Sequence, residues 1–235
     1  MDSLNLTSAG ALVELDESLA MRSIGLCPNL SCLSRGSAKV REGGADAYTS
    51  WGRWTAGRME LRVLGLPAGI TLTANHGLHY LVGTPSVTVP TSGVFGYGLI
   101  GSTQPTLSTG VVSPGVFTGS AGVAFGPGQP AKIGLDGSVS IGGASYGFAT
   151  PGGASDPMRS TLSTATGYGF SGDVSAAQSG KGPLNCGAIG CPVSVRGGLF
   201  GPNAARLGLS YQIQGPAGGS TISGVGVFAQ QPAQP

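Results

Sequence analysis

The feature that most constrains the fold is a regular alternation of apolar residues with small or polar ones between positions 193 and 230. Two alternating stretches flank the turn Gly201-Pro202-Asn203-Ala204, and a third follows the Gly-rich segment after Ile213. Successive side chains of a strand point to opposite faces, so a period of two is typical of strands with one buried face. Three such strands joined by short turns predict the wall of an antiparallel sheet.

The same alternation begins at Gly93 and continues through most of the chain. Glycine supplies 44 of the 235 residues and often alternates with an aromatic residue, which suits a sheet that must bend until it closes. We therefore predict an all-β fold: an antiparallel up-and-down β-barrel of about eight to ten strands, Gly-rich, with long loops. The residues expected to face its packed interior are Phe95, Tyr97, Phe117, Phe125, Leu209, Tyr211 and Ile213.

Turn signals give the expected divisions of the chain. Asp136-Gly137 predicts a two-residue hairpin, and Gly142-Gly143 predicts a further bend. A short helix near the N-terminus is an alternative to strands there, because Leu12, Leu15 and Leu19 also fit one helical face. The expected parts are N-terminal strands with the Cys27–Cys32 turn in residues 1–50, as the first part of the barrel, the main barrel in residues 51–230, and a disordered tail in residues 231–235.

The four cysteines form two pairs with the same spacing, and each pair lies among turn residues. We predict two local disulfides, Cys27–Cys32 and Cys186–Cys191, because an even count with local pairing is typical of an oxidising compartment. The alternative is a zinc site, but four residues between ligands is the outer limit of the usual spacing. We expect no metal and no cofactor.

Charged residues are scarce and concentrated near the N-terminus. Residues 1–62 hold 14 of the 22 charged side chains, and the formal net charge is only +2. The chain therefore offers no basic surface for nucleic acid. It opens acidic, without the cationic segment and apolar run of an export signal, so we expect it to be cut from a longer precursor.

Two tryptophans and a histidine are the candidate ligand-binding residues. Trp51 and Trp54 are three residues apart, so a regular strand would place them on opposite faces, one in the core and one at the rim. The alternative is an aromatic platform for a ligand. His79 lies in a strand pattern and fits a hydrogen-bonded structural histidine, although it could also line the mouth of the barrel with the tryptophans. With His76 it makes too few ligands for a metal.

Motifs that suggest enzymes lack the context that their chemistry needs. Gly96-Tyr-Gly98-Leu-Ile-Gly101 fits the dinucleotide fingerprint, but no helix follows it. Ser145 stands in a Gly-x-Ser-x-Gly pattern, yet both histidines precede it, whereas the hydrolase order places the histidine after the serine. We therefore expect a protein that is not an enzyme.

Four stretches carry a resemblance to a known family. Residues 197–204, which end in Gly201-Pro202-Asn203-Ala204, resemble the turn of transferrin-binding-protein-B-type barrels of Gram-negative surface lipoproteins. The stretches 50–54, 77–83, 99–106 and 201–206 are together similar to the C-terminal barrel region of proteobacterial FecR-domain proteins. The resemblance implies an eight-stranded antiparallel barrel outside the inner membrane. It also implies binding through variable loops, since the related barrels bind transferrin, haem carriers or other host factors.

These observations predict a non-enzymatic binding module, extracytoplasmic in a Gram-negative bacterium, in the periplasm or at the cell surface. A structural or assembly unit that packs with other subunits is the alternative, and self-association would accompany it. An integral outer-membrane barrel fits less well, because aromatic residues are only 6% of the chain and cannot form girdles. We expect an unknown protein or small ligand to bind through loops 102–115, 150–166 and 175–192, the longest irregular stretches.

Overall fold

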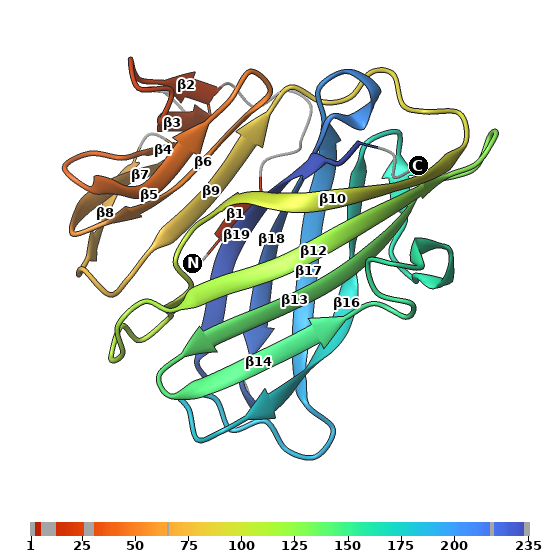
Figure 1. The fold of residues 1–235 in the computed structure, drawn as a ribbon. Coiled ribbons are helices and arrows are strands. Elements are labelled where there is room, and N and C mark those ends of the chain that lie inside the picture. Colours follow the sequence, from red (N-terminus) through yellow and green to blue (C-terminus); the bar gives the residue numbers. More distant parts are fainter. Residues whose placement is uncertain (1–2, 6–12, 26–30, 65, 217–218, 233–235) are drawn as a thin grey trace.

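The structure, a computed structural model, describes residues 3–5, 13–25, 31–64, 66–216 and 219–232. Its strands form three sheets, the largest of which closes into a barrel (Figure 1). Two single helical turns, η1 (Pro157–Arg159) and η2 (Pro202–Ala204), lie in the connections between strands.

Eight strands form the barrel wall, and each pairs antiparallel with the next along the chain. The first and last of them, β10 and β19, also pair with each other and close the wall. The eight strands are β10 (Gly93–Ser102), β12 (Val116–Phe125), β13 (Lys132–Ile141), β14 (Ala144–Ala149), β16 (Gly169–Ser179), β17 (Cys191–Phe200), β18 (Arg206–Gln214) and β19 (Thr221–Gln230). Two short strands, β11 (Thr106–Leu107) and β15 (Thr164–Thr166), pair at its ends. The predicted all-β, up-and-down barrel is confirmed.

The barrel interior is one apolar cluster that the alternating residues fill. Six of the seven residues expected to face inward are buried in it, and Phe95 packs against it half-buried. Phe117 stacks on Tyr211 with ring centroids 4.9 Å apart. Burying an aromatic side chain of this kind contributes about 1.5–3 kcal/mol, so the cluster supplies much of the driving force for barrel closure.

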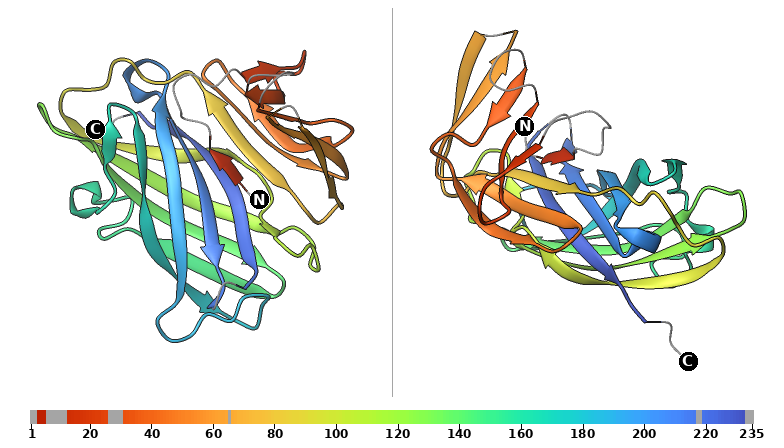
Figure 2. Two further views of the ribbon diagram at one scale, coloured as in Figure 1. Left: turned by 180° about the vertical axis from the view of Figure 1, so that it is seen from behind. Right: turned by 90° about the horizontal axis from the view of Figure 1, so that it is seen from above.

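Two further sheets lie beside the barrel and contain all the described strands before residue 84 (Figure 2). The four-stranded sheet has the order β1 (Ser3–Asn5), β9 (Leu78–Gly83), β6 (Thr49–Thr55) and β5 (Lys39–Ala45). The five-stranded sheet has the order β2 (Val13–Leu15), β3 (Met21–Gly25), β4 (Cys32–Ser34), β7 (Gly57–Val63) and β8 (Leu66–Leu72). The expected division at residue 51 falls within β6, and the strands of residues 1–50 belong to these sheets rather than to the barrel wall.

The four-stranded sheet is a middle layer between the barrel and the five-stranded sheet. Every residue of β6 is buried, since one face of the sheet packs on the barrel and the other on the five-stranded sheet. Trp51 lies against Val225 and Val227 of the barrel, and Gly101 of β10 leaves room for its ring because any Cβ there would collide with it. β6 therefore lies between two packed layers, with neither face open to solvent.

The turn that carried the family resemblance joins the barrel to the middle layer. Arg206 pairs with Asp46 and lies over the ring of Tyr48, which precedes β6. Gly201 has a φ of 71° and lies against the same ring, where a side chain would not fit. These residues therefore hold the sheets together at one end of the barrel.

One predicted turn is wrong. Asp136 and Gly137 lie in the middle of β13, paired with β12 on one side and β14 on the other. The ring of Phe148 lies over Gly137, and the Asp136 carboxylate accepts a hydrogen bond from the Ala154 N–H. Asp136 thus accepts a hydrogen bond on the outside of the wall, and Gly137 leaves room for an aromatic ring. The chain turns at Gly142-Gly143 instead.

Candidate functional site

Strand directions decide which loops share an end of the barrel. β10 and β16 run towards the same end, so loops 102–115 and 175–192 both emerge there, beside the β13–β14 turn. Gly142 in that turn contacts Pro183 and Val112. Loop 150–166 lies towards the opposite end, near the β12–β13 turn (Figure 1). The structure thus brings two of the three predicted loops together.

A cleft of about 630 Å³ opens at the shared end, which we name the cleft end. Its walls are residues 112–116 of one loop and residues 140–145 around the β13–β14 turn. They offer serine hydroxyls, backbone groups and aliphatic side chains, but no titratable side chain. Val116 is 60% exposed at its edge. Such a surface suits a neutral or apolar ligand group and has nothing to transfer a proton.

The second loop of the cleft end is held firmly. Cys186 and Cys191 form a disulfide, which confirms that prediction, whereas Cys27 of the other predicted pair lies outside the described residues. The Leu184 N–H donates to the Tyr146 hydroxyl at 3.1 Å, and Leu184 itself is buried. Ile189, between the two cysteines, is 93% exposed. Loop 175–192 is therefore held by the disulfide and by Leu184, and it exposes the apolar side chain of Ile189 to solvent.

Replacing both Cys186 and Cys191 with serine should lower the free energy of unfolding by about 2 kcal/mol or less, because the bridge closes a short loop. Urea unfolding of the oxidised protein and the double variant measures this difference. Peptide mapping without reductant gives an independent check. A bridge that joined Cys186 to Cys27 or Cys32 would contradict the local pairing.

The structure does not bring the three candidate ligand-binding residues to a common surface. Trp51 and Trp54 lie on opposite faces of β6, as their spacing predicted, but both are buried, so the expected rim position of one of them is wrong. The Trp54 indole N–H donates to the Met21 carbonyl oxygen at 3.0 Å. His79 in β9 is also buried. Each has a structural role in this packing, and a role in ligand binding stays a prediction.

His79 links the middle layer to the loop that forms the cleft. Its Nδ1 lies 2.7 Å from the Thr103 hydroxyl, and its Nε2 lies 2.8 Å from the Thr106 hydroxyl. Burial and, secondarily, the positive charge of Arg53 lower the pKa of His79 to about 3. The ring is therefore neutral, with one N–H and one lone pair, and this matches two hydroxyl partners.

Arg53 supports the same junction from within the middle layer. It is buried and binds the Glu42 carboxylate with two nitrogens, at 2.7 and 2.9 Å. Its third nitrogen donates to the carbonyl oxygens of Ala74 and His76 in the β8–β9 turn. Asn75 of that turn donates to the Gly110 carbonyl oxygen at 3.1 Å. Sequence reasoning missed Arg53, because its partners come from distant segments without a shared motif.

Arg53→Met should lower the free energy of unfolding by about 2–3 kcal/mol. Breaking a buried pair usually costs about 3–5 kcal/mol, and Glu42 keeps part of its hydration because its side chain is 21% exposed. Arg41→Met on the neighbouring strand, where the side chain is exposed, is the matched control and should change stability by less than about 0.5 kcal/mol. Equal urea midpoints for the two variants would contradict this role of Arg53.

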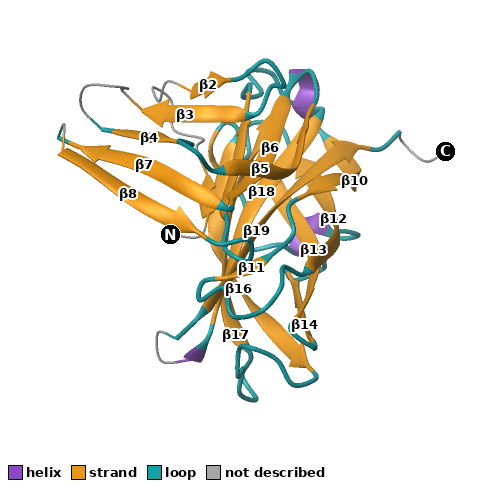
Figure 3. Ribbon diagram, turned by 90° about the vertical axis from the view of Figure 1, so that its left-hand side faces the viewer, coloured by secondary structure: helices purple, strands orange, loops and turns teal. Residues whose placement is uncertain are grey.

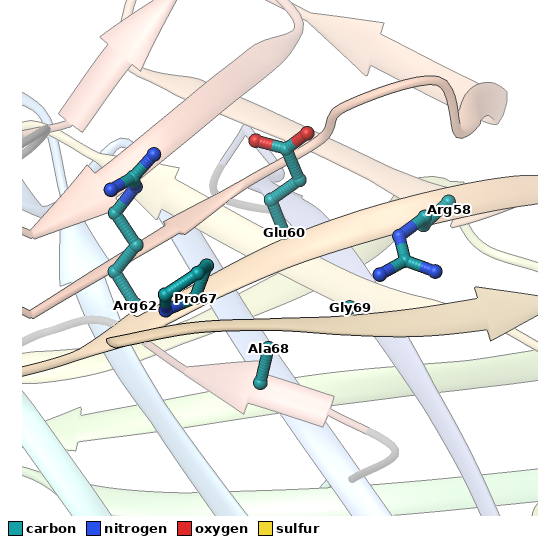
Figure 4. Close-up of a pocket in the computed structure, with 6 residues that line it drawn as sticks. All are labelled: Arg58, Glu60, Arg62, Pro67, Ala68 and Gly69. Carbon is teal, nitrogen blue, oxygen red and sulfur yellow. The ribbon is translucent and has the colours of Figure 1, made fainter. Parts of the chain in front are cut away.

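A second hollow, of about 220 Å³, lies on the β7–β8 hairpin (Figure 4). Its lining residues are Arg58, Glu60, Arg62, Pro67, Ala68 and Gly69. No motif singles out this hairpin, since the arginines alternate with apolar residues as on any half-buried strand. Three charged side chains line this hollow, whereas none lines the cleft.

The described residues contain no group of three or more His, Cys, Asp or Glu side chains arranged to hold a metal ion. Among them, no helix has the length and apolar character needed to cross a membrane.

Comparison with known proteins gives distant structural likenesses. No family model matches the chain, and no curated protein matches its sequence, so the FecR association stays a prediction. A point mutant of transferrin binding protein B from Haemophilus parasuis Hp5 aligns with a TM-score of 0.42 and 14% identity, over 90% of this chain and 36% of that one. This chain thus spans about a third of that protein's length.

Two other solved structures align at a similar level. A protein described as a surface lipoprotein has a TM-score of 0.41 and 10% identity, with 82% of this chain and 81% of that chain covered. Isotype 1 transferrin binding protein B from serogroup B Neisseria meningitidis has a TM-score of 0.37 and 13% identity, over 85% of this chain and 38% of that one. The barrel assignment rests on the strand pairing described above.

Proposed function

We propose that this protein is a non-enzymatic, extracytoplasmic binding module that takes a ligand at the cleft end of its barrel. The observation that carries the proposal is the cleft itself, about 630 Å³ in volume and open to solvent between the end of loop 102–115 and the β13–β14 turn, with loop 175–192 beside that turn. Both loops are held in place, one by the Cys186–Cys191 disulfide and the other by hydrogen bonds to His79 and Asn75. Rigid loops bind with a smaller loss of conformational entropy, so such a site is suited to recognition.

The chemistry of the cleft end supports binding without catalysis. Its lining has no acid, base or cysteine nucleophile, and the serines have no histidine beside them. Val116, the first residue of β12, exposes an apolar side chain at the edge of the cleft, and Ile189 exposes another from loop 175–192. We infer a ligand that presents a largely uncharged surface, and a protein partner is the reading we favour because exposed apolar side chains at loop tips suit protein contacts.

The disulfide also supports a location outside the cytoplasm. Bridges such as Cys186–Cys191 form and persist in oxidising compartments and are rare where thiols are kept reduced. We extend the proposal to the periplasm or cell surface of a Gram-negative bacterium, as the sequence resemblance implies.

Native mass spectrometry of protein purified from its own host tests this proposal. We expect a retained ligand or partner that is lost in Val116→Asp, which places a charge at the edge of the cleft. Met158→Asp in loop 150–166 is the matched control, since Met158 is similarly exposed but lies towards the opposite end. Loss of the ligand in Met158→Asp with retention in Val116→Asp would place the site elsewhere. A protein that retains nothing in any form would favour the structural or assembly role.

A further inference from the structure

The five-stranded sheet ends in an open edge strand. Among the described residues β8 pairs only with β7, and Leu66, Pro67, Ala68 and Gly69 are all exposed along it. Such an edge offers unpaired backbone N–H and C=O groups, which proteins usually protect with charged residues, proline or a covering segment. Of these protecting residues, β8 has Pro67 near its start but no charged residue. Figure 3 shows this hairpin projecting from the side of the barrel.

Two arginines on β7 place positive charge beside this edge. Arg58 and Arg62 alternate with Glu60 on one face of the strand, and none of the three has an ion pair among the described residues. The guanidinium of Arg58 extends across β8 above Gly69, in space that a side chain at this position would take from it. In Figure 4 the Glu60 carboxylate points away from that guanidinium. A carboxylate carried by an added strand would therefore meet a free cation.

The tip of the same hairpin is apolar and exposed. Leu64 and Leu66 are 79% and 74% exposed, and Val63 beside them is half-exposed. Single exposed apolar residues are ordinary, but three at the end of an open edge strand give a partner a contact that excludes water. The hairpin thus combines backbone groups, a cationic hollow and an apolar tip.

We infer that the β8 edge is a second docking surface, separate from the cleft end, which adds an extended acidic segment of a partner protein as a sixth strand. Backbone hydrogen bonds would supply affinity, as in other cases of strand addition. The hollow over Ala68 and Gly69 takes one acidic side chain, and Arg58 and Arg62 give the preference for carboxylates.

The charges favour a foreign segment over a second copy of this chain. Pairing two β8 edges would bring the arginines of both copies towards the same junction, where like charges repel. Of the acidic groups near the opposite edge of the sheet, Glu14 accepts a hydrogen bond from Ser23 and Asp16 pairs with Arg35, which leaves Glu17 in the β2–β3 turn rather than on the edge strand.

Fluorescence anisotropy with a labelled ten-residue peptide of alternating valine and glutamate tests the inference on the full chain. We expect binding to this peptide and none to its valine–lysine counterpart. The double substitution Arg58→Ala and Arg62→Ala should weaken binding by about tenfold or more, since it removes two charge-assisted contacts. Gly69→Glu should do the same, because its own carboxylate would occupy the hollow beside Arg58.

Three controls keep the inference open to refutation. Lys39→Ala with Arg41→Ala removes the same charge from exposed positions on β5 and should leave binding within about twofold, as should Val116→Asp at the cleft end. Hydrogen exchange should show new protection of β8 amides in the complex. If binding depends on the arginines but the β8 amides gain no protection, the peptide binds through its charges alone, and strand addition is wrong. Concentration-dependent dimerisation abolished by Gly69→Glu would identify the occupant as a second copy, which also contradicts the inference.

Discussion

Phe117→Ala should lower the free energy of unfolding by about 3–5 kcal/mol, the usual cost of emptying an aromatic position in a packed core. Phe117 is 4% exposed, stacks on Tyr211, and meets Phe228 edge-on with centroids 6.4 Å apart. Gly226 lies beside its ring and has no side chain that could move into the space. The cavity would therefore stay largely unfilled.

Urea unfolding of the two proteins followed by tryptophan fluorescence measures the effect. Ser120→Ala on the same strand is the matched control, because Ser120 is exposed and should change stability by less than about 0.5 kcal/mol. An unchanged midpoint for Phe117→Ala would mean that β12 has the opposite face towards the interior.

Acidification should destabilise the protein through His79 well before the carboxylates protonate. The pKa of His79 is about 3 in the folded protein and 6.5 in an unfolded chain, so the unfolded state binds the extra proton as the pH falls. Stability is complete above pH 6.5 and is lost between 6.5 and 3. The expected loss is about 2 kcal/mol between pH 7 and pH 5 and roughly 4 kcal/mol by pH 3.

His79→Gln separates this effect from other titrations. The variant should be less stable at pH 7, because Thr103 and Thr106 lose their matched partner, but its stability should change little between pH 7 and pH 5. NMR of the His79 ring should show no protonation above pH 4. A ring that titrates near pH 6.5 in the folded protein would contradict the buried, neutral state.

The barrel could be predicted because most of its wall strands have one buried face and one face open to solvent, although the middle layer also covers the outer face of β18 and β19. Phe117, Tyr211 and Ile213 alternate with residues that face the other way, and the pattern survives in the sequence. β6 has no such pattern because both of its faces are covered. The pairing of β1 with β9 is parallel and joins segments more than 70 residues apart, so no local signal indicates it.

The loops of the candidate site could be predicted from the sequence, but the end of the barrel at which each lies could not. That end depends on whether the number of preceding hairpins is odd or even. Each hairpin reverses the chain, so the predicted turn at Asp136-Gly137 would have placed loop 150–166 beside loop 102–115 and loop 175–192 at the other end. In the structure β13 is continuous, and loops 102–115 and 175–192 share an end instead. Dividing β13 into two strands therefore predicts the wrong loop, 150–166 instead of 175–192, beside loop 102–115.

The pairing of β10 with β19 sets the order in which the molecule can be completed. The two strands are joined edge to edge, yet more than 100 residues separate them along the chain. During synthesis the wall can grow hairpin by hairpin from β10, but it stays an open sheet with two bare edges until β19 has left the ribosome. Nascent chains that stop before Thr221 therefore expose both edges, and these are the chains that depend most on chaperones.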